Sequence, residues 1–325
     1  MIEYLAIILT AVLSYTITTK LIPHLKDSGI SGRDMNKGEN PIIAEMGGLA
    51  VVAAFVIAVM GVLFMNTLGI WMPVKGMDPT LLMAGALTVV LAAFIGVVDD
   101  LISLKQWQKA IIPIVAAVPL IAVKAGVSTM WIPFFGVVEF GIFFYVLIIP
   151  IIVTGATNAT NMLAGFNGVE AGMGLVSLLG LGSVCFYEGN YEAAVIGLAT
   201  AGALIGFVFK NKFPASVFPG DVGTLAIGAA IAAVTILGNV HKIGLLILCL
   251  YLLEFGLKAL GGFKTQSWCR VEHGLLVCNN IKEIHGTGRL IMYLSGGISE
   301  KKLTIILVTL QSLFVIIGII FFYTA

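Results

Sequence analysis

The chain has 325 residues, of which 59% are hydrophobic and 11% are charged, and its mean hydropathy is +1.07. Soluble domains contain about 45–50% apolar and about 25% charged residues, so this composition excludes a water-soluble globular protein and indicates one that crosses a membrane repeatedly. The net charge of +1 argues against a nucleic-acid partner.

About 20 consecutive apolar residues cross a bilayer, and this length predicts an all-α polytopic membrane protein with about ten transmembrane helices. The predicted spans are 2–21, 42–64, 80–98, 108–123, 137–154, 171–187, 192–209, 222–239, 242–260 and 303–323. We expect the fourth span to be kinked, because it contains Pro113 and Pro119. Residues 1–325 are expected to form a single membrane domain, with a long loop at 262–302 before the last helix.

The predicted loops differ sharply between the two sides of the membrane. Fifteen of the eighteen Lys and Arg residues fall in one set of five loops, and the opposite side holds only Lys75, Lys124 and Lys242. Because cytoplasmic loops are enriched in Lys and Arg, the first set is predicted to face the cytoplasm, with both chain termini extracytoplasmic. Twelve of the seventeen acids lie on or near that same side, which makes it the expected working surface.

Two adjacent acids, Asp99 and Asp100, follow the uncharged run Leu81–Val98. A carboxylate at the centre of a bilayer costs about 2.5–3.5 kcal/mol, so acids near membrane depth are usually functional. Two neighbouring acids repel each other unless a cation or a basic group offsets them, and Lys109 follows nine residues later. The pair therefore predicts bound metal, phosphate chemistry or proton traffic. An ordinary solvated helix end is the alternative.

The segment 154–172 is polar, rich in glycine and free of Lys and Arg, although it is predicted to face the basic side. Asn158 and Asn161 are three residues apart, so on a helix they share one face. Their oxygens can bind a hard cation and their amides can donate to phosphate or to a base edge. The bland alternative is a polar loop with capping asparagines.

Asp221 begins another apolar helix, within the segment Phe218–Thr224. An aspartate there is either the N-cap of the helix or a metal ligand at the membrane boundary.

The segment 258–302 is basic, and it is either a solvated loop or a cover for an anionic substrate. Within it, Leu275–Val277 and Leu290–Leu294 suit short strands or an interfacial helix.

Together these residues resemble the polyprenyl-phosphate N-acetylhexosamine-1-phosphate transferase family, and most of all its eukaryotic and archaeal dolichyl-phosphate GlcNAc-1-phosphate transferase branch. The resemblance rests on four motifs: Gly32–Lys37 followed by Glu45–Gly48, Phe94–Asp100 with Lys109, Thr157–Gly172, and Gly220–Thr224. The motifs cover about forty residues, and their order and sidedness agree with a ten-span family along the whole chain.

The resemblance implies that UDP-N-acetylglucosamine reacts with a polyprenyl or dolichyl phosphate in the membrane lipid, giving a lipid-linked pyrophosphoryl sugar and UMP. It implies Mg²⁺ as cofactor, with Mn²⁺ as a substitute. The active site would face the cytoplasm from the cell membrane or an ER-type membrane. The oligomeric state is left open, with a homodimer as one option.

The matched motifs also imply residue roles. The implied catalytic residues are Asp99, Asp100 and Lys109, and the implied metal ligands are Asn161 and Asp221. The implied substrate-binding residues are Asp34, Asn36, Lys37, Glu45, Asn158, Asn167, Gly168, Arg270 and His273. Among these, Asn167 would contact the uracil, Lys109 the phosphates, and Glu45 the acetamido sugar.

The chain departs from the family in one place. The dolichol branch has an arginine–histidine–arginine cluster in the last loop, where this chain has Arg270-Val-Glu-His273.

One rival function is an ion-coupled transporter, which predicts acids near the midplane and a repeat between two halves. The acids here gather at one interface, and no repeat is visible. The other rival is the same chemistry with a different UDP-amino sugar.

Overall fold

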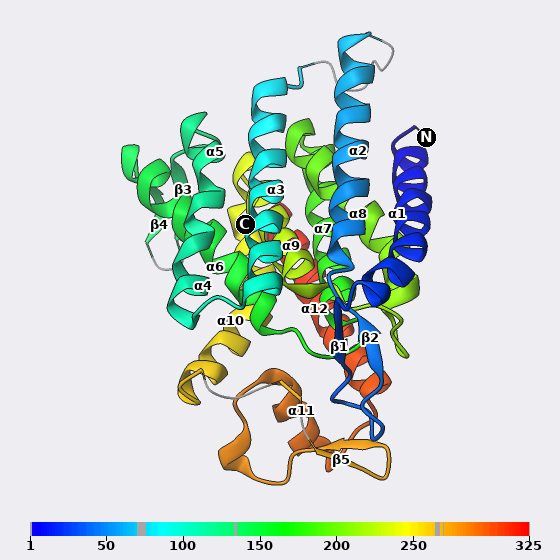
Figure 1. Cartoon of the computed structure of the whole chain (residues 1–325). Coiled ribbons are helices and arrows are strands. Elements are labelled where there is room, and N and C mark those ends of the chain that lie inside the picture. The colour runs from blue at the N-terminus through cyan, green and yellow to red at the C-terminus, as the bar shows by residue number, and fades with distance from the viewer. Residues whose placement is uncertain (1, 70–75, 133–134, 264–266, 269, 325) are drawn as a thin grey trace.

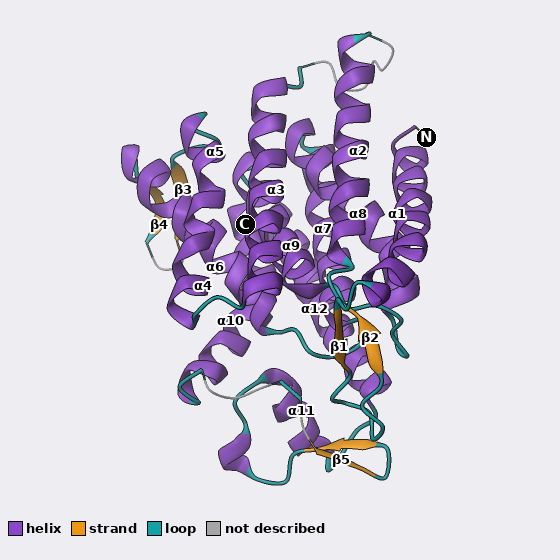
Figure 2. Cartoon of the chain, viewed as in Figure 1, coloured by secondary structure: helices purple, strands orange, loops and turns teal. Residues whose placement is uncertain are grey.

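The computed structural model describes residues 2–69, 76–132, 135–263, 267–268 and 270–324, and most of them are helical (Figure 2). Among these residues, nine helices are long and apolar enough to cross a membrane, which confirms an integral membrane protein. They are α1 (Ile2–Asp27), α2 (Gly48–Thr67), α3 (Pro79–Ile102), α6 (Ile149–Met162, continuous with the π-helical turn Phe144–Ile148), α7 (Val169–Tyr187), α8 (Tyr191–Asn211), α9 (Gly220–Leu237), α10 (His241–Leu260) and α12 (Glu300–Thr324).

The predicted span at 108–123 is broken into three short pieces, as the kink expected there indicates. These are α4 (Gln106–Ile111), the 3₁₀ helix η2 (Ile112–Ala117) and α5 (Val118–Ala122). Pro113 stands at the start of η2 and Pro119 at the start of α5. Proline lacks a backbone N–H and clashes with the preceding turn, so each proline ends one helical piece and begins the next.

The all-α prediction needs a correction, because the structure contains three two-stranded antiparallel hairpins. They pair β1 (Ser31–Arg33) with β2 (Ile42–Ala44), β3 (Thr129–Ile132) with β4 (Gly136–Glu139), and β5 (Arg270–Glu272) with β6 (Leu275–Val277).

Two predicted spans therefore start too early. The helix predicted at 42–64 starts only at Gly48, after strand β2. The helix predicted at 137–154 includes residues that belong to strand β4. The physical reason is that a short apolar run carries too few residues to distinguish a strand from a helix end.

The cytoplasmic loop predicted at 262–302 has structure of its own, although its residues 264–266 and 269 lie outside the described part of the chain. It contains the β5–β6 hairpin, the 3₁₀ turn η4 (Ile281–Glu283) and α11 (Thr287–Ser295). Leu275–Val277 thus forms a strand, and Leu290–Leu294 belongs to a helix. The loop ends at Glu300, where α12 begins.

Helix α9 is the centre of the bundle. Every residue from Val222 to Leu237 is buried, and small side chains let neighbouring helices come close. A Cβ atom on Gly96 of α3 would lie 2.5 Å from the carbonyl oxygen of Asp221, and one on Gly48 of α2 would lie 2.4 Å from Cα of Gly223. The end of α3 and the beginning of α2 are therefore in backbone contact with the first turn of α9.

The polar elements gather at one end of the bundle (Figure 1). The β1–β2 and β5–β6 hairpins and α11 lie below the start of α2 and the end of α3, and the N-terminus lies at the opposite end. The residues singled out in the sequence are carried by these elements and by the adjoining helix ends.

Candidate active site

Lys109 joins two of the predicted acids from different helices. Its Nζ atom lies 2.7 Å from Oδ2 of Asp99, at the end of α3, and 3.3 Å from Oδ2 of Asp221, in the first turn of α9. The second oxygen of Asp99 accepts a hydrogen bond from the backbone N–H of Leu104 at 2.9 Å. The Asp99 side chain is only 3% exposed, so its charge depends on these partners.

Asp100 caps the start of α9 from a neighbouring helix. Its Oδ1 accepts the N–H of Asp221 at 2.8 Å and its Oδ2 accepts the N–H of Val222 at 3.1 Å. The first N–H groups of a helix have no partner within the helix, and Asp100 satisfies two of them. The alternative that Asp221 is itself the N-cap is wrong, because Pro219 holds that position.

Glu45 lies beside this group, between β2 and α2. A Cβ atom on Gly32 would lie 2.8 Å from Oε1 of Glu45, so the carboxyl lies against the backbone of β1. Burial raises the pKa of the Glu45 carboxyl above its ordinary value, and the negative charge of Asp100 raises this pKa further. The hairpin thus brings a fourth acid within electrostatic reach of the cluster.

Helix α6 brings its two asparagines to the same end of the bundle. The amide of Asn158 donates to the carbonyl of Ala110, next to Lys109, at 3.4 Å, and to that of Thr154 at 2.9 Å. The hydroxyl of Thr160 donates to the carbonyl of Thr224 in the first turn of α9 at 2.9 Å.

Asn161 follows Thr160 directly, so its backbone lies close to the N-terminal half of α9. Within the described part of the chain, its side chain has no hydrogen-bond partner.

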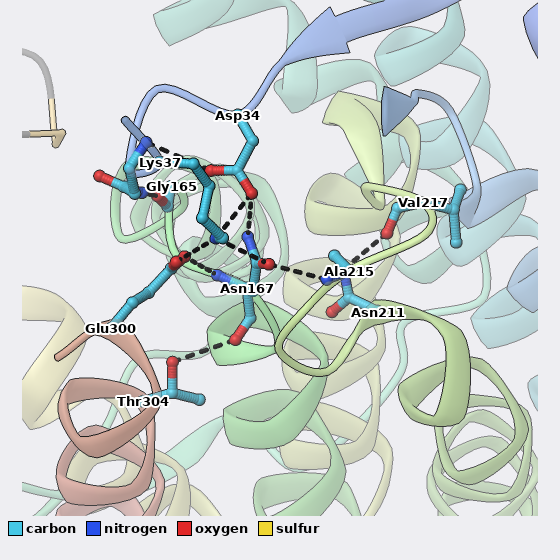
Figure 3. Close-up of polar contacts among 10 residues, drawn as sticks. Asp34, Lys37, Gly165, Asn167, Asn211, Ala215, Val217, Glu300 and Thr304 are labelled. Atoms are coloured by element: carbon cyan, nitrogen blue, oxygen red, sulfur yellow. Dashed lines mark hydrogen bonds and ion pairs between the residues drawn. The ribbon is translucent and has the colours of Figure 1, made fainter. Parts of the chain in front are cut away.

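A second group of predicted residues meets around Asn167 (Figure 3). Its amide nitrogen donates to Oδ2 of Asp34 at 3.1 Å, and its amide oxygen accepts from the backbone N–H of Ala215 at 2.8 Å and from Lys37 at 3.3 Å. Lys37 also forms ion pairs with Asp34, at 2.8 Å, and with Glu300. Asp34, Asn167 and Glu300 are each less than 5% exposed, so this is a buried, internally paired network.

Asn36 and Gly168 set the shape of the loop that carries Asn167. The side-chain amide of Asn36 donates to the carbonyl of Gly165 at 2.6 Å. Gly168 has φ of +83° at the start of α7, a left-handed conformation that glycine adopts without strain.

Arg270 and His273 are not part of either group. Both are exposed residues of the β5–β6 hairpin, and neither forms a hydrogen bond or an ion pair with the described residues of the two groups. The segment instead reaches the second group through Glu300, which the sequence analysis did not single out. The signal that would have found Glu300 is the one that found Asp221, a carboxylate in the first turn of a long apolar helix.

The charge of the first group fits a bound divalent cation. When all three acids are ionised, Asp99, Asp100 and Asp221 place three negative charges around the single positive charge of Lys109, a net charge of −2. Among the described residues, no three His, Cys, Asp or Glu side chains form a metal site by themselves. Mg²⁺ fits such a place, because it usually takes one or two carboxylates and fills its remaining positions with phosphate oxygens and waters.

Comparison with known proteins decides the family. Residues 81–239 match the model of glycosyl transferase family 4, a region that holds Asp99, Asp100, Lys109, Asn161 and Asp221. A Saccharolobus solfataricus protein named "Putative UDP-N-acetylglucosamine--dolichyl-phosphate N-acetylglucosaminephosphotransferase" is 34% identical over 97% of this chain and 95% of its own length. The chain belongs to glycosyl transferase family 4.

Other relatives carry the same name or that of a neighbouring activity. A Sulfolobus acidocaldarius protein with the same name is 30% identical over 99% of this chain and 98% of its own length. A phospho-N-acetylmuramoyl-pentapeptide-transferase of Lacticaseibacillus paracasei is 30% identical over 67% of this chain and 69% of its own length. The similarity to the two archaeal proteins thus extends over nearly the whole of this family 4 chain, well beyond the region matched by the family model.

We expect Asp100→Ala to destabilise the protein by about 0.5–2 kcal/mol, the usual effect of removing a helix N-cap. Two N–H groups at the start of α9 would lose their acceptor. The melting temperature in one detergent, followed by circular dichroism, measures this loss. The matched control is Asp27→Ala, which removes an exposed acid from the end of α1. Equal melting temperatures for the two variants would contradict the capping role.

Proposed function

We propose that this chain transfers N-acetylglucosamine-1-phosphate from UDP-N-acetylglucosamine to a polyprenyl phosphate of the dolichyl type, releasing UMP. The observation that carries the proposal is the joining of Asp99, Lys109 and Asp221 at the ends of apolar helices, within the region that matches the family. The names of the two archaeal relatives, which match this chain along nearly its whole length, support the same substrates.

The location suits two substrates of opposite solubility. A polyprenyl phosphate reaches the ends of the helices from within the bilayer, and a nucleotide sugar reaches them from water. We propose that this end of the bundle faces the cytoplasm, because the loops predicted to be cytoplasmic hold fifteen of the eighteen basic residues. The β1–β2 and β5–β6 hairpins lie at that end (Figure 1).

Phosphoryl transfer depends chiefly on positioning and on stabilisation of charge. Lys109 is the residue that serves both purposes here, since its ammonium lies between two acids at the helix ends and is 30% exposed. A phosphate that enters beside it gains a cationic partner held in a fixed position. A phosphate monoester has a second pKa near 6, so the attacking lipid phosphate is largely ionised at neutral pH. Electrostatics therefore contribute more than proton removal by Asp99 or Asp100.

We propose that Mg²⁺, for which Mn²⁺ would substitute, is held by Asp221 and Asn161. When bound, the ion would supply positive charge that offsets the negative charge of the phosphates. Two observations support this assignment: the side chain of Asn161 has no hydrogen-bond partner among the described residues, and the acids around Lys109 leave a net charge of −2 when they are ionised. The loop that carries Asn167, held in place by Asp34 and Lys37, would receive the nucleoside, and Glu45 would lie near the sugar.

The direct test is release of UMP by purified protein supplied with Mg²⁺, UDP-N-acetylglucosamine and a polyprenyl phosphate. We expect UMP and a lipid-linked sugar in equal amounts, and no UMP when the lipid phosphate is left out. UDP-N-acetylmuramoyl-pentapeptide is the control donor, because one set of relatives is named for that substrate class. Faster turnover with the control donor would assign the other sugar, and no UMP from any donor and lipid would end the enzyme assignment.

The metal assignment is tested separately with Asp221→Asn, which removes one charge and keeps the shape of the side chain. We expect the Mg²⁺ concentration for half-maximal activity to rise about tenfold or more, because a carboxylate binds the ion better than an amide does. Asp27→Asn, at an exposed position, serves as the control. An unchanged Mg²⁺ dependence in the Asp221 variant would place the ion elsewhere.

A further inference from the structure

The last helix of the chain holds the peptide of Asn167 from both sides. The backbone N–H of Asn167 donates to Oε1 of Glu300 at 2.7 Å, and the hydroxyl of Thr304 donates to the carbonyl of Asn167 at 3.0 Å. Glu300 and Thr304 are one turn apart at the start of α12 (Figure 3). The helix therefore fixes the distance between the two side chains that bind the Asn167 peptide. More than 130 residues separate them from Asn167 in the sequence.

Glu300 also fixes the lysine that touches the Asn167 side chain. Glu300 is 4% exposed and forms an ion pair with Lys37. Lys37 is also paired with Asp34. A buried carboxylate is stable only when it is paired and hydrogen-bonded, and Glu300 meets both conditions through Lys37 and Asn167. Lys37 further lies 4.5 Å from the centroid of the Phe213 ring, in the loop between α8 and α9. Three loops from distant parts of the chain are thereby locked to α12.

We infer that Glu300 and Thr304 are positioning residues for nucleotide binding, which hold the Asn167 turn in the conformation that receives the uridine moiety. This inference rests on the proposed function, and it assigns a role to α12, which lies beyond the region matched by the family model. Among the described residues, neither side chain forms a hydrogen bond or an ion pair with Asp99, Lys109 or Asp221. Their loss therefore acts on nucleotide affinity and leaves the chemical step intact.

The test uses Glu300→Gln, which keeps the shape of the side chain but removes the ion pair with Lys37, and Thr304→Val, which removes the hydroxyl donor. A hydrogen bond to a charged group is stronger than one between neutral groups, so we expect KM for UDP-N-acetylglucosamine to rise about tenfold in Glu300→Gln and less in Thr304→Val. We expect kcat at saturating donor and KM for the polyprenyl phosphate to stay at the wild-type values. The matched controls are Glu39→Gln, an exposed acid of the β1–β2 loop, and Thr309→Val, an exposed threonine of the same helix.

Binding of UDP, measured by titration calorimetry, provides a readout that does not depend on turnover. We expect the Kd for UDP to rise in both variants and in neither control. A fall in kcat with KM and Kd unchanged, or equal effects in variants and controls, would overturn the inference.

The two proposals fail in different ways. If Glu300→Gln does not fold, Thr304→Val decides alone. If the wild-type protein binds UDP but releases no UMP, the proposed function fails. The Kd values for UDP in the variants and controls then still test the positioning role of Glu300 and Thr304. If the wild-type protein binds no UDP, the inference is wrong.

Discussion

The ion pairs of Lys109 with Asp99 and Asp221 are the interaction on which the rest of this molecule depends. They join α4 to the end of α3 and to the start of α9, where two carboxylates would otherwise repel each other at the edge of the apolar region. Asp100 adds a third link by accepting two N–H groups of α9. The acids that give the site its charge are thus also the groups that fix the helix ends.

This arrangement is possible because the helices meet at glycines. Gly96 faces the backbone of Asp221, and Gly48 faces Gly223, at distances that leave no room for a Cβ atom. The functional groups are therefore mounted on closely packed helix ends around a buried α9, and a site built on such elements holds its geometry better than one built on loops. The Asn167 loop lies outside these helix ends, and the start of α12 holds it through hydrogen bonds to the Asn167 peptide.

The sequence predicts the parts of this account that depend on hydropathy and local pattern. A carboxylate at the end of a long apolar run marks a membrane boundary, and this rule placed Asp99, Asp100 and Asp221 at one end of the bundle. Helical spacing aligned Asn158 with Asn161, and the two prolines predicted the break in the fourth span. Each of these inferences requires only neighbouring residues.

The remaining features come from tertiary packing, which no local pattern reports. Asp100 caps a helix more than 100 residues away in the sequence, and Glu300 pairs with Lys37. Both contacts depend on which helices lie side by side. The predicted span at 42–64 includes strand β2, because the apolar run of β2 is too short to show a period. Arg270 and His273 are implied only by the resemblance of the last loop to the family, and their exposure on the β5–β6 hairpin depends on how that loop packs.

The central claim is that the ammonium group of Lys109 holds the acidic ends of α3 and α9 together. The melting temperature of Lys109→Met, with and without Mg²⁺, is the most direct test of it. Methionine keeps the unbranched shape of the side chain, one atom shorter, and removes its charge, leaving the buried Asp99 without its ammonium partner. The account predicts a melting temperature several degrees below that of the wild type. It also predicts that Mg²⁺ restores more stability to the variant than it adds to the wild-type protein. An unchanged melting temperature that does not respond to Mg²⁺ would contradict it.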